Sequence, residues 1–371
     1  MRFFKLLIVS FILFGSTIIF SSNSYNQSNE IGNTSSNAWH FISLGDTRQE
    51  IGDWDNISQS FTTDNASSPK RAAIFNSIIE NNPNLEFIIH TGDMTKSGGE
   101  QDDWNRYYED IENVTKNNIP IYYAVGNHER YNYAYGEGLW APPDNNFSVY
   151  LSNVELPGNE RYYSFDFDNQ IHFIFINTDE FWEGGDEGTF NITTEQFSWI
   201  SSDLKSNSIE FAIAVFHRPC YSIRRPSRVL AAQEIRRVLE PLFITHGVDL
   251  VFSGHDHYYY RTTRHGITHV VTGGGGAELA INGDLSEWQE YDVYFSDYHY
   301  CNVSVTDNGG KFSVKTESHR LDLKTQTSII ADSFTIEIST ESSTNSTSVT
   351  VPIIVLFLGT LTVIVRKQRH T

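Results

Sequence analysis

The sequence predicts a layered α/β fold, and three observations lead to this prediction. Short apolar runs typical of strands alternate with helical patterns from residue 39 to about 257, as they do in βαβ units. From Tyr258 to Thr316 the pattern changes to strands separated by glycine-rich turns, which predicts a second sheet. Of the 371 residues, about 280 remain once both ends are set aside, which suits one large domain.

Six apolar runs are predicted to be strands and four segments to be helices. Continuous apolar runs are expected where a strand is buried on both faces, and they cover residues 40–44, 86–90, 121–125, 171–176, 211–216 and 250–253. Apolar residues at helical spacing cover residues 69–81, 102–114, 195–205 and 229–244. Asp168 and Asn169 precede one of the strands and predict a hairpin turn there.

The composition restricts the partners of this chain. Hydrophobic residues at 39% and aromatic residues at 14% are typical of a folded protein. The formal net charge of -20 argues against nucleic acid bound by phosphate neutralisation. A small anionic molecule is still attracted to a bound divalent cation, because such an ion is the largest local charge wherever it sits. We therefore expect a small substrate and no nucleic acid, and the sequence leaves the oligomeric state open.

Residues 1–22 have the layout of an export signal. Arg2 and Lys5 precede an apolar run, and a serine-rich stretch follows it. Cleavage is expected near Ser21 or Ser22. An uncleaved N-terminal anchor is the alternative, and either form would export the domain that follows.

The other end of the chain predicts a membrane anchor. Residues 349–365 are apolar apart from threonines and Pro352, which predicts a single-pass transmembrane helix, with a buried core helix as the alternative. The basic tail 366–371 then stays in the cytoplasm, by the positive-inside bias, and leaves the folded domain extracellular. Residues 331–348 are predicted to be a Ser/Thr-rich stalk, so the folded domain covers residues 38–330.

Sequons and cysteines agree with export. Nine Asn-x-Ser/Thr sequons predict a glycoprotein of the cell membrane. They begin at Asn26, Asn33, Asn56, Asn65, Asn113, Asn146, Asn191, Asn302 and Asn345. Cys220 and Cys301 are the two cysteines, and an exported location permits a disulfide between them. Two unpaired buried thiols are the alternative, since sequence does not give their distance.

Five polar clusters, each directly after a predicted strand, form the candidate functional site. They are GDTR from Gly45, GDMT from Gly92, GNHE from Gly126, HRP from His217 and GHDH from Gly254. Strand ends in α/β sheets open onto one crevice, so these clusters are expected to converge. Their candidate metal ligands are Asp46, Asp93, Asn127, His217, His255 and His257. This set has no thiolate and suits Mn, Fe or Zn.

His255 and His257 lie two residues apart in the last cluster. In an extended segment, residues two apart point to the same face. Both imidazoles are therefore expected to reach one metal cluster, while Asp256 points away.

The order GD, GD, GNHE, H and GHxH resembles the calcineurin-like metallophosphoesterase superfamily, and HRP-x-Y with GHDHYYYR resembles its purple-acid-phosphatase-like branch. The resemblance spans about residues 39–280. It implies a two-sheet β-sandwich flanked by helices, with two metals bridged by one carboxylate. By position it implies a first metal on Asp46 and His257, a bridging Asp93, and a second metal on Asn127, His217 and His255. It also implies that His128 is an acid beside the metals, which Glu129 would orient.

Two positions depart from that family pattern. The family commonly has Asp-x-His in its first motif, where this chain has Arg48, a side chain that stays protonated and cannot coordinate a metal. The purple branch has a Tyr where this chain has Lys96, so a ferric-tyrosinate colour is not expected. Either water completes a loosely held first metal, or Arg48 supplies the positive charge and one metal suffices. Two metals are favoured, because Asp46, Asp93 and His257 still offer three ligands.

Together these observations predict hydrolysis of a phosphomonoester or phosphodiester by metal-activated water, with His128, Asp93 and Arg48 as catalytic residues. The alternative is a surface binding domain that keeps the fold and has lost turnover through the change to Arg48. Arg218 and Tyr221 either contact the phosphate or leaving group, or pack structurally. The sequence does not identify the substrate.

Overall fold

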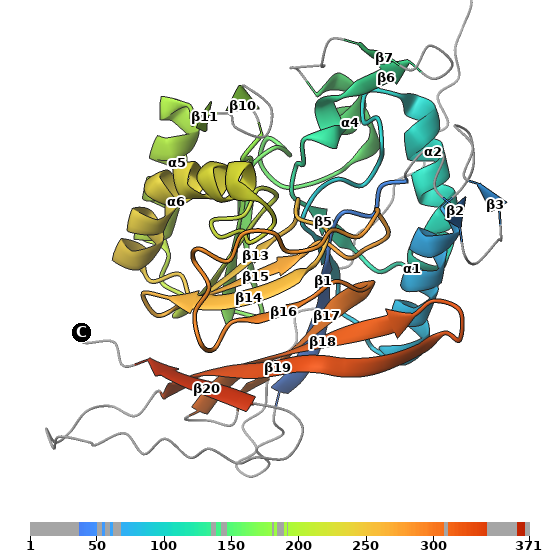
Figure 1. The fold of residues 1–371 in the computed structure, drawn as a ribbon. Coiled ribbons are helices and arrows are strands. Elements are labelled where there is room, and N and C mark those ends of the chain that lie inside the picture. Colours follow the sequence, from blue (N-terminus) through green and yellow to red (C-terminus); the bar gives the residue numbers. More distant parts are fainter. Residues whose placement is uncertain are drawn as a thin grey trace, which may run out of the picture. The chain divides into compact units, whose positions relative to one another are not determined.

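Two seven-stranded β-sheets form the frame of the fold (Figure 1). This computed structural model describes residues 37–49, 54–55, 60–61, 68–134, 139–141, 147–179, 182–183, 189–190, 192–307, 311–339 and 362–367. All of them belong to one unit, Ser36–Thr371. The predicted export signal, residues 1–22, lies outside the described residues.

The first sheet combines parallel strands with an antiparallel meander. Its order is β20 (Thr362–Lys367), β19 (Thr327–Ser339), β18 (Lys311–Asp322), β17 (His299–Asp307), β1 (Asn37–Leu44), β4 (Ile88–His90) and β5 (Ile121–Tyr123). β1, β4 and β5 are parallel, and β17 pairs antiparallel with β1. The carboxyl ends of β1, β4 and β5 therefore lie at one edge, where three of the polar clusters follow.

The second sheet has a parallel centre with antiparallel strands at its sides. Its order is β16 (Val293–Phe295), β14 (Tyr259–Arg264), β15 (Ile267–Thr272), β13 (Leu250–Ser253), β12 (Phe211–Phe216), β9 (Ile171–Ile176) and β8 (Tyr163–Phe167). β9, β12, β13 and β15 run parallel. The predicted hairpin turn between β8 and β9 is confirmed, because Asp168 and Asn169 have φ values of 52° and 51°, as its turn type requires.

Helices cover the outer faces of both sheets. They are α1 (Pro69–Asn81), α2 (Gln101–Asp110), α3 (Glu112–Lys116), α4 (Ser148–Asn153), α5 (Thr194–Ser206), α6 (Pro226–His246) and the 3₁₀ turn η1 (His128–Arg130). Capping defines several starts: Ser68 and Thr193 accept backbone N–H groups of α1 and α5, and Pro226 opens α6. The predicted helix 102–114 is two helices, which meet at Ile111.

Short two-stranded ribbons complete the described elements. They pair β2 (Trp54–Asp55) with β3 (Ser60–Phe61), β6 (Asn132–Ala134) with β7 (Leu139–Ala141), and β10 (Trp182–Glu183) with β11 (Thr189–Phe190).

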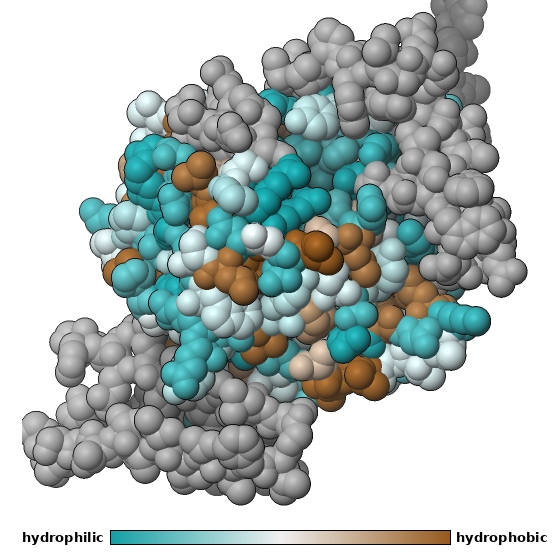
Figure 2. Space-filling view, viewed as in Figure 1, coloured by the Kyte–Doolittle hydropathy of each residue, from teal (hydrophilic) through white to brown (hydrophobic). Residues whose placement is uncertain are grey.

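Three apolar layers hold this arrangement together. The middle layer lies between the sheets and includes Phe41, Phe173 and Val303. A second layer packs α1 and α2 on the first sheet, and a third packs α5 and α6 on the second sheet. The surface in Figure 2 is accordingly mostly hydrophilic, with separate small hydrophobic patches. The predicted fold class, a two-sheet sandwich flanked by helices, is confirmed.

The predicted second sheet exists, but the segment from Tyr258 to Thr316 is divided between the two sheets. β14, β15 and β16 complete the second sheet, whereas β17 and β18 join the first. The reason is that β1 needs a partner on its other side, and β17 supplies one over seven residue pairs. Such long-range pairing leaves no local trace in the sequence.

The predicted stalk, residues 331–348, begins too early. Residues 331–339 belong to β19, where Phe334, Ile336 and Ile338 are buried in the layer between the sheets. These apolar residues alternate with period two, which is the pattern of a strand. The folded domain therefore extends to at least Ser339, beyond the predicted boundary at residue 330.

The predicted anchor, residues 349–365, falls mostly outside the described residues. Its last four residues lie in β20, which pairs parallel with β19, so they are strand and not helix. Among the described residues, no helix has the length and apolar character needed to cross a bilayer.

Cys220 and Cys301 are both buried free thiols. The predicted alternative of two unpaired buried cysteines is therefore confirmed, and a disulfide between them is wrong. Burial raises the pKa of both thiols, which disfavours the reactive thiolate.

Candidate metal centre

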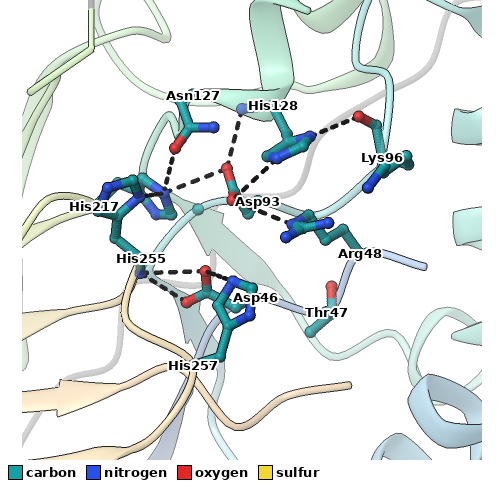
Figure 3. A network of polar contacts seen from close by, with 12 residues as sticks. Asp46, Thr47, Arg48, Asp93, Lys96, Asn127, His128, His217, His255 and His257 are labelled. Carbon is teal, nitrogen blue, oxygen red and sulfur yellow. Dashed lines mark hydrogen bonds and ion pairs between the residues drawn. The ribbon is translucent and has the colours of Figure 1, made fainter. Parts of the chain in front are cut away.

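The loops after β1 and β4 lie side by side and carry the two aspartates. The backbone N–H of Asp46 donates to Gly92 O at 3.0 Å, and that of Arg48 donates to Asp93 O at 3.0 Å. Asp46 and Asp93 both have left-handed backbone conformations, with φ values of 56° and 59°. This shared sharp turn brings both carboxylates to the same side of the sheet edge (Figure 3).

The loop after β5 packs tightly against these two. A Cβ added at Gly126 would lie 2.4 Å from the backbone nitrogen of Asp93, so only glycine fits there. The buried carboxylate of Glu129 accepts N–H bonds from Asp93 at 2.8 Å, Met94 at 2.9 Å and Gly126 at 2.7 Å. Glu129 thus holds two loops together. Its predicted role of orienting His128 stays a prediction.

One group of donors gathers around His217. Its Nε2 atom lies 3.3 Å from Asp93 Oδ1, 3.2 Å from Asn127 Oδ1 and 3.1 Å from His255 Nδ1. Asp93, His217 and His255 are all buried, and their donor atoms lie within 4.8 Å of one another. Residues from both sheets therefore meet at one point.

A second group of donors shares Asp93 with the first. It consists of Asp46, Asp93 and His257, again within 4.8 Å of one another. His257 Nε2 lies 3.4 Å from Asp46 Oδ1, and the backbone N–H of His255 donates to both oxygens of Asp46. The structure thus brings all six predicted ligands together, in two groups with Asp93 between them.

Hydrogen bonds on the outer ring nitrogens orient two of these histidines. Carbonyl oxygens only accept, so His217 Nδ1–H donates to Thr91 O at 2.9 Å and His257 Nδ1–H donates to Glu278 O at 2.6 Å. In the neutral rings, both Nε2 lone pairs then face carboxylate oxygens. Two acceptors facing each other need a positive charge between them, which a proton on the ring supplies without metal and which an ion with nitrogen and oxygen ligands would supply when bound.

His255 has a different partner. Arg218 donates to His255 Nε2 at 2.8 Å and to Asp179 Oδ1 at 2.6 Å. In the neutral ring the proton of His255 is therefore on Nδ1, which faces His217. A neutral His255 would hold a metal through Nδ1 only with its proton moved to Nε2 and with Arg218 turned away from that atom. Arg218 thus fixes the ring of His255 in the absence of metal, and Tyr221 packs away from the centre by donating to Glu240.

The segment that holds His255 and His257 is turned, not extended as predicted. His255 has a φ of 71°, and Asp256 N–H donates to Gly254 O two residues back. The two imidazoles consequently face different carboxylates. Asp256 points away as predicted, because it accepts hydrogen bonds from Ser222 and Tyr258.

Charge at the centre is strongly coupled through Asp93. Burial alone would raise the pKa of Asp93, but His217, His128 and Arg48 hold it well below its usual range. Burial opposes the charged form of His217, yet Asp93 and Asp46 raise its pKa to about 10. The buried carboxylates thus strongly stabilise positive charge beside them.

His128 and Arg48 lie on the other side of Asp93. His128 Nδ1–H donates to Lys96 O at 2.6 Å, and its Nε2 lies 3.9 Å from Asp93 Oδ2. Burial, and then Arg48, lower the pKa of His128 to about 3, so its ring is neutral near pH 7. Arg48 Nε lies 3.6 Å from Asp93 Oδ2 (Figure 3). Both predicted catalytic residues therefore face the shared carboxylate.

A glycine-rich segment, which the sequence did not predict to belong to the site, packs against the loop of Asp46. Gly275 N–H donates to Gly45 O, and Ala277 N–H donates to Asp46 O, each at 2.9 Å. A Cβ at Gly273 would lie 2.8 Å from Asp46 Oδ2. The four consecutive glycines from residue 273 were the available signal, because close backbone approach requires them.

Comparison with known proteins agrees with this geometry. The family model described as calcineurin-like phosphoesterase matches residues 40–259. Purple acid phosphatase 15 of Arabidopsis thaliana is 28% identical over 193 residues, covering 47% of this chain and 32% of that protein. The probable inactive purple acid phosphatase 1 of the same plant is 27% identical over 270 residues, covering 62% and 41%. The chain thus spans less than half the length of these curated relatives.

A solved structure shares the fold. The purple acid phosphatase PPD1 from yellow lupin (Lupinus luteus) seeds superposes with a TM-score of 0.62 at 21% identity, covering 86% of this chain and 58% of that one. The family match covers more than half of the 371 residues. This chain therefore belongs to the calcineurin-like phosphoesterase family.

Proposed function

We propose that this chain hydrolyses a phosphate ester, a phosphomonoester or phosphodiester, in a metal-dependent reaction. The observation that supports this most directly is the pair of buried donor groups that share Asp93. A small substrate fits the acidic chain better than a nucleic acid, since a net charge of -20 repels polyanions.

The proposed metals are Mn, Fe or Zn, two per chain or one. Bound ions would act as Lewis acids, and they would lower the pKa of a bound water so that it supplies hydroxide near neutral pH. Asp46 and His257 would hold one ion. The other ion would be held by Asn127, His217 and His255. Asp93 would be a ligand of both ions. Arg48, beside Asp93, adds fixed positive charge for an anionic substrate.

Removal of metal is expected to abolish activity. Hydrolysis of an aryl phosphate should fall to background after chelation and return when Mn or Zn is added back. Metal analysis of the same protein should give two ions per chain, and one ion that is unaffected by Arg48→His would favour the single-metal form. Activity that survives complete metal removal would contradict the proposal.

We propose that Nε2 of His128 takes part in a proton transfer during the reaction. Its Nδ1–H is held by the Lys96 carbonyl, so Nε2 is the nitrogen directed at the centre. In the neutral ring Nε2 carries no proton, so the donation predicted from the family pattern requires His128 to be protonated first. His128→Ala should lower the rate by about 10²–10⁴-fold with metal content unchanged. A loss far below tenfold would exclude this role.

The second candidate is a binding domain on the same fold. Its support is Arg48 beside the shared carboxylate, together with a similar protein whose name calls it probably inactive. Normal metal content with no turnover on any aryl phosphate would favour this function over catalysis.

We propose an extracellular, membrane-anchored location on the sequence patterns of both ends. The apolar run and serine-rich stretch of residues 1–22, the apolar residues 349–361 before β20 and the sequons support it. Protease added to intact cells should release the folded domain, and full protection inside sealed cells would contradict this location.

A further inference from the structure

Arg71 is a buried cation directly behind the two aspartate loops. Its side chain is 2% exposed, and it projects from α1. One guanidinium nitrogen, Nη1, donates to Thr47 O at 3.3 Å and to Met94 O at 3.1 Å. Thr47 and Met94 immediately follow Asp46 and Asp93. A single nitrogen atom therefore joins the backbones of both carboxylate loops.

Asp110 fixes Arg71 from the opposite side. Its Oδ2 atom accepts from Arg71 Nε at 3.1 Å and from Nη2 at 2.5 Å. The same oxygen accepts the backbone N–H of Ser68 at 2.7 Å, at the start of α1. The guanidinium also lies over the Tyr107 ring, 5.2 Å from its centroid. Asp110 and Tyr107 thus fix the orientation of the guanidinium that contacts the loops.

The sequence places this charge where an apolar residue would pack. Arg71 precedes Ile74, Phe75 and Ile78 by three, four and seven residues, so it occupies the buried stripe of α1. An ion pair in such a position contributes little net stability compared with apolar residues of the same volume. What an apolar residue cannot supply is the pair of hydrogen bonds to Thr47 O and Met94 O.

Besides Arg71, the two loops are joined by backbone hydrogen bonds, by the ion pair of Arg48 with Asp93 and by the Thr47 hydroxyl. The Thr47 hydroxyl contacts Met94 O at 3.3 Å and His90 Nε2 at 3.0 Å. Hydrogen bonds from a charged donor are stronger than neutral ones, and Arg71 reaches both loops at once. Side chains that orient ligands in this way control metal affinity without touching the ion.

We propose that the Arg71–Asp110 pair positions the ligand loops of the metal centre. It would set the spacing of Asp46 and Asp93 so that both carboxylates can bind the one ion that they share. This rests on the proposed metal-dependent function. It assigns Arg71 a role that acts through the ligand loops, and no contact with substrate.

The chain offers a matched control for the test. Arg261 is also 2% exposed, bonds the two oxygens of Asp332 through Nε and Nη2, and lies over the Phe334 ring at 5.1 Å. It joins β14 to β19, and its described partners are not candidate ligands. Arg71→Lys and Arg261→Lys therefore make the same chemical change in two buried ion pairs.

The test measures Mn²⁺ affinity by chelator competition and thermal unfolding for both variants. Arg71→Lys is expected to weaken Mn²⁺ binding about 10–100-fold, because one ammonium cannot bond Asp110 and both carbonyls at the same time, as the three guanidinium nitrogens do. Arg261→Lys should leave affinity within about twofold while lowering the unfolding temperature. If Arg71→Lys does not fold, Asp110→Asn replaces it, with the same expected loss of affinity.

Two outcomes would overturn the inference. Unchanged Mn²⁺ affinity in the Arg71→Lys or Asp110→Asn variant would leave the pair only a structural role. An equal loss in Arg261→Lys would make the effect one of general destabilisation. If the unmodified chain bound neither Mn²⁺ nor Zn²⁺ nor iron, the proposed function itself would be refuted, so the two failures are distinguishable.

Discussion

Asp93→Asn is expected to lower phosphoesterase activity on the order of 1000-fold and to remove most bound metal. Asp93 is the residue that both donor groups share, so its charge serves every ion in the proposed centre. The substitution keeps the side-chain shape and the acceptor for His128 N–H at 3.0 Å. What it removes is the negative charge that offsets His217 and Arg48.

The measurement combines metal analysis with rates on an aryl phosphate. Asp203→Asn is a suitable control, because Asp203 pairs with Ser164 and His172 away from the centre. Asp203→Asn should keep its full metal content and nearly all activity. An Asp93→Asn protein that keeps a tenth of normal activity with full metal would refute the shared-ligand role.

Asp332→Ala is expected to lower the free energy of unfolding by about 3–5 kcal/mol. Asp332 lies on β19 and accepts from Arg261 and Tyr259 on β14, so it joins the two sheets across the core. Without it, Arg261 remains a buried charge with no compensating carboxylate. This is the situation in which breaking an ion pair is most destabilising.

Denaturant unfolding of the folded domain measures this loss. The double substitution of Arg261→Met and Asp332→Leu should recover most of it, because it removes both charges and keeps the volume. The result also decides the stalk boundary, since residue 332 would be insensitive in a flexible stalk. A loss below about 1 kcal/mol for Asp332→Ala would contradict the described pairing.

Local pattern determined much of the fold. Continuous apolar runs predicted β9, β12 and β13 with their observed bounds, and helical spacing predicted α1 in full. These signals are local, because burial on both faces and helical periodicity are properties of a few neighbouring residues. The alternation of Phe334, Ile336 and Ile338 was equally local, but a serine- and threonine-rich context obscured it.

The sequence by itself determined the chemistry of the site: the type and order of Asp46, Asp93, Asn127, His217, His255 and His257. Only the tertiary structure decided that Glu129 joins two loops and that Arg71 and Asp110 lie behind the aspartates. The physical reason is distance along the chain. A ligand type is fixed by one residue, whereas a support contact depends on which distant backbone groups packing brings within hydrogen-bonding reach.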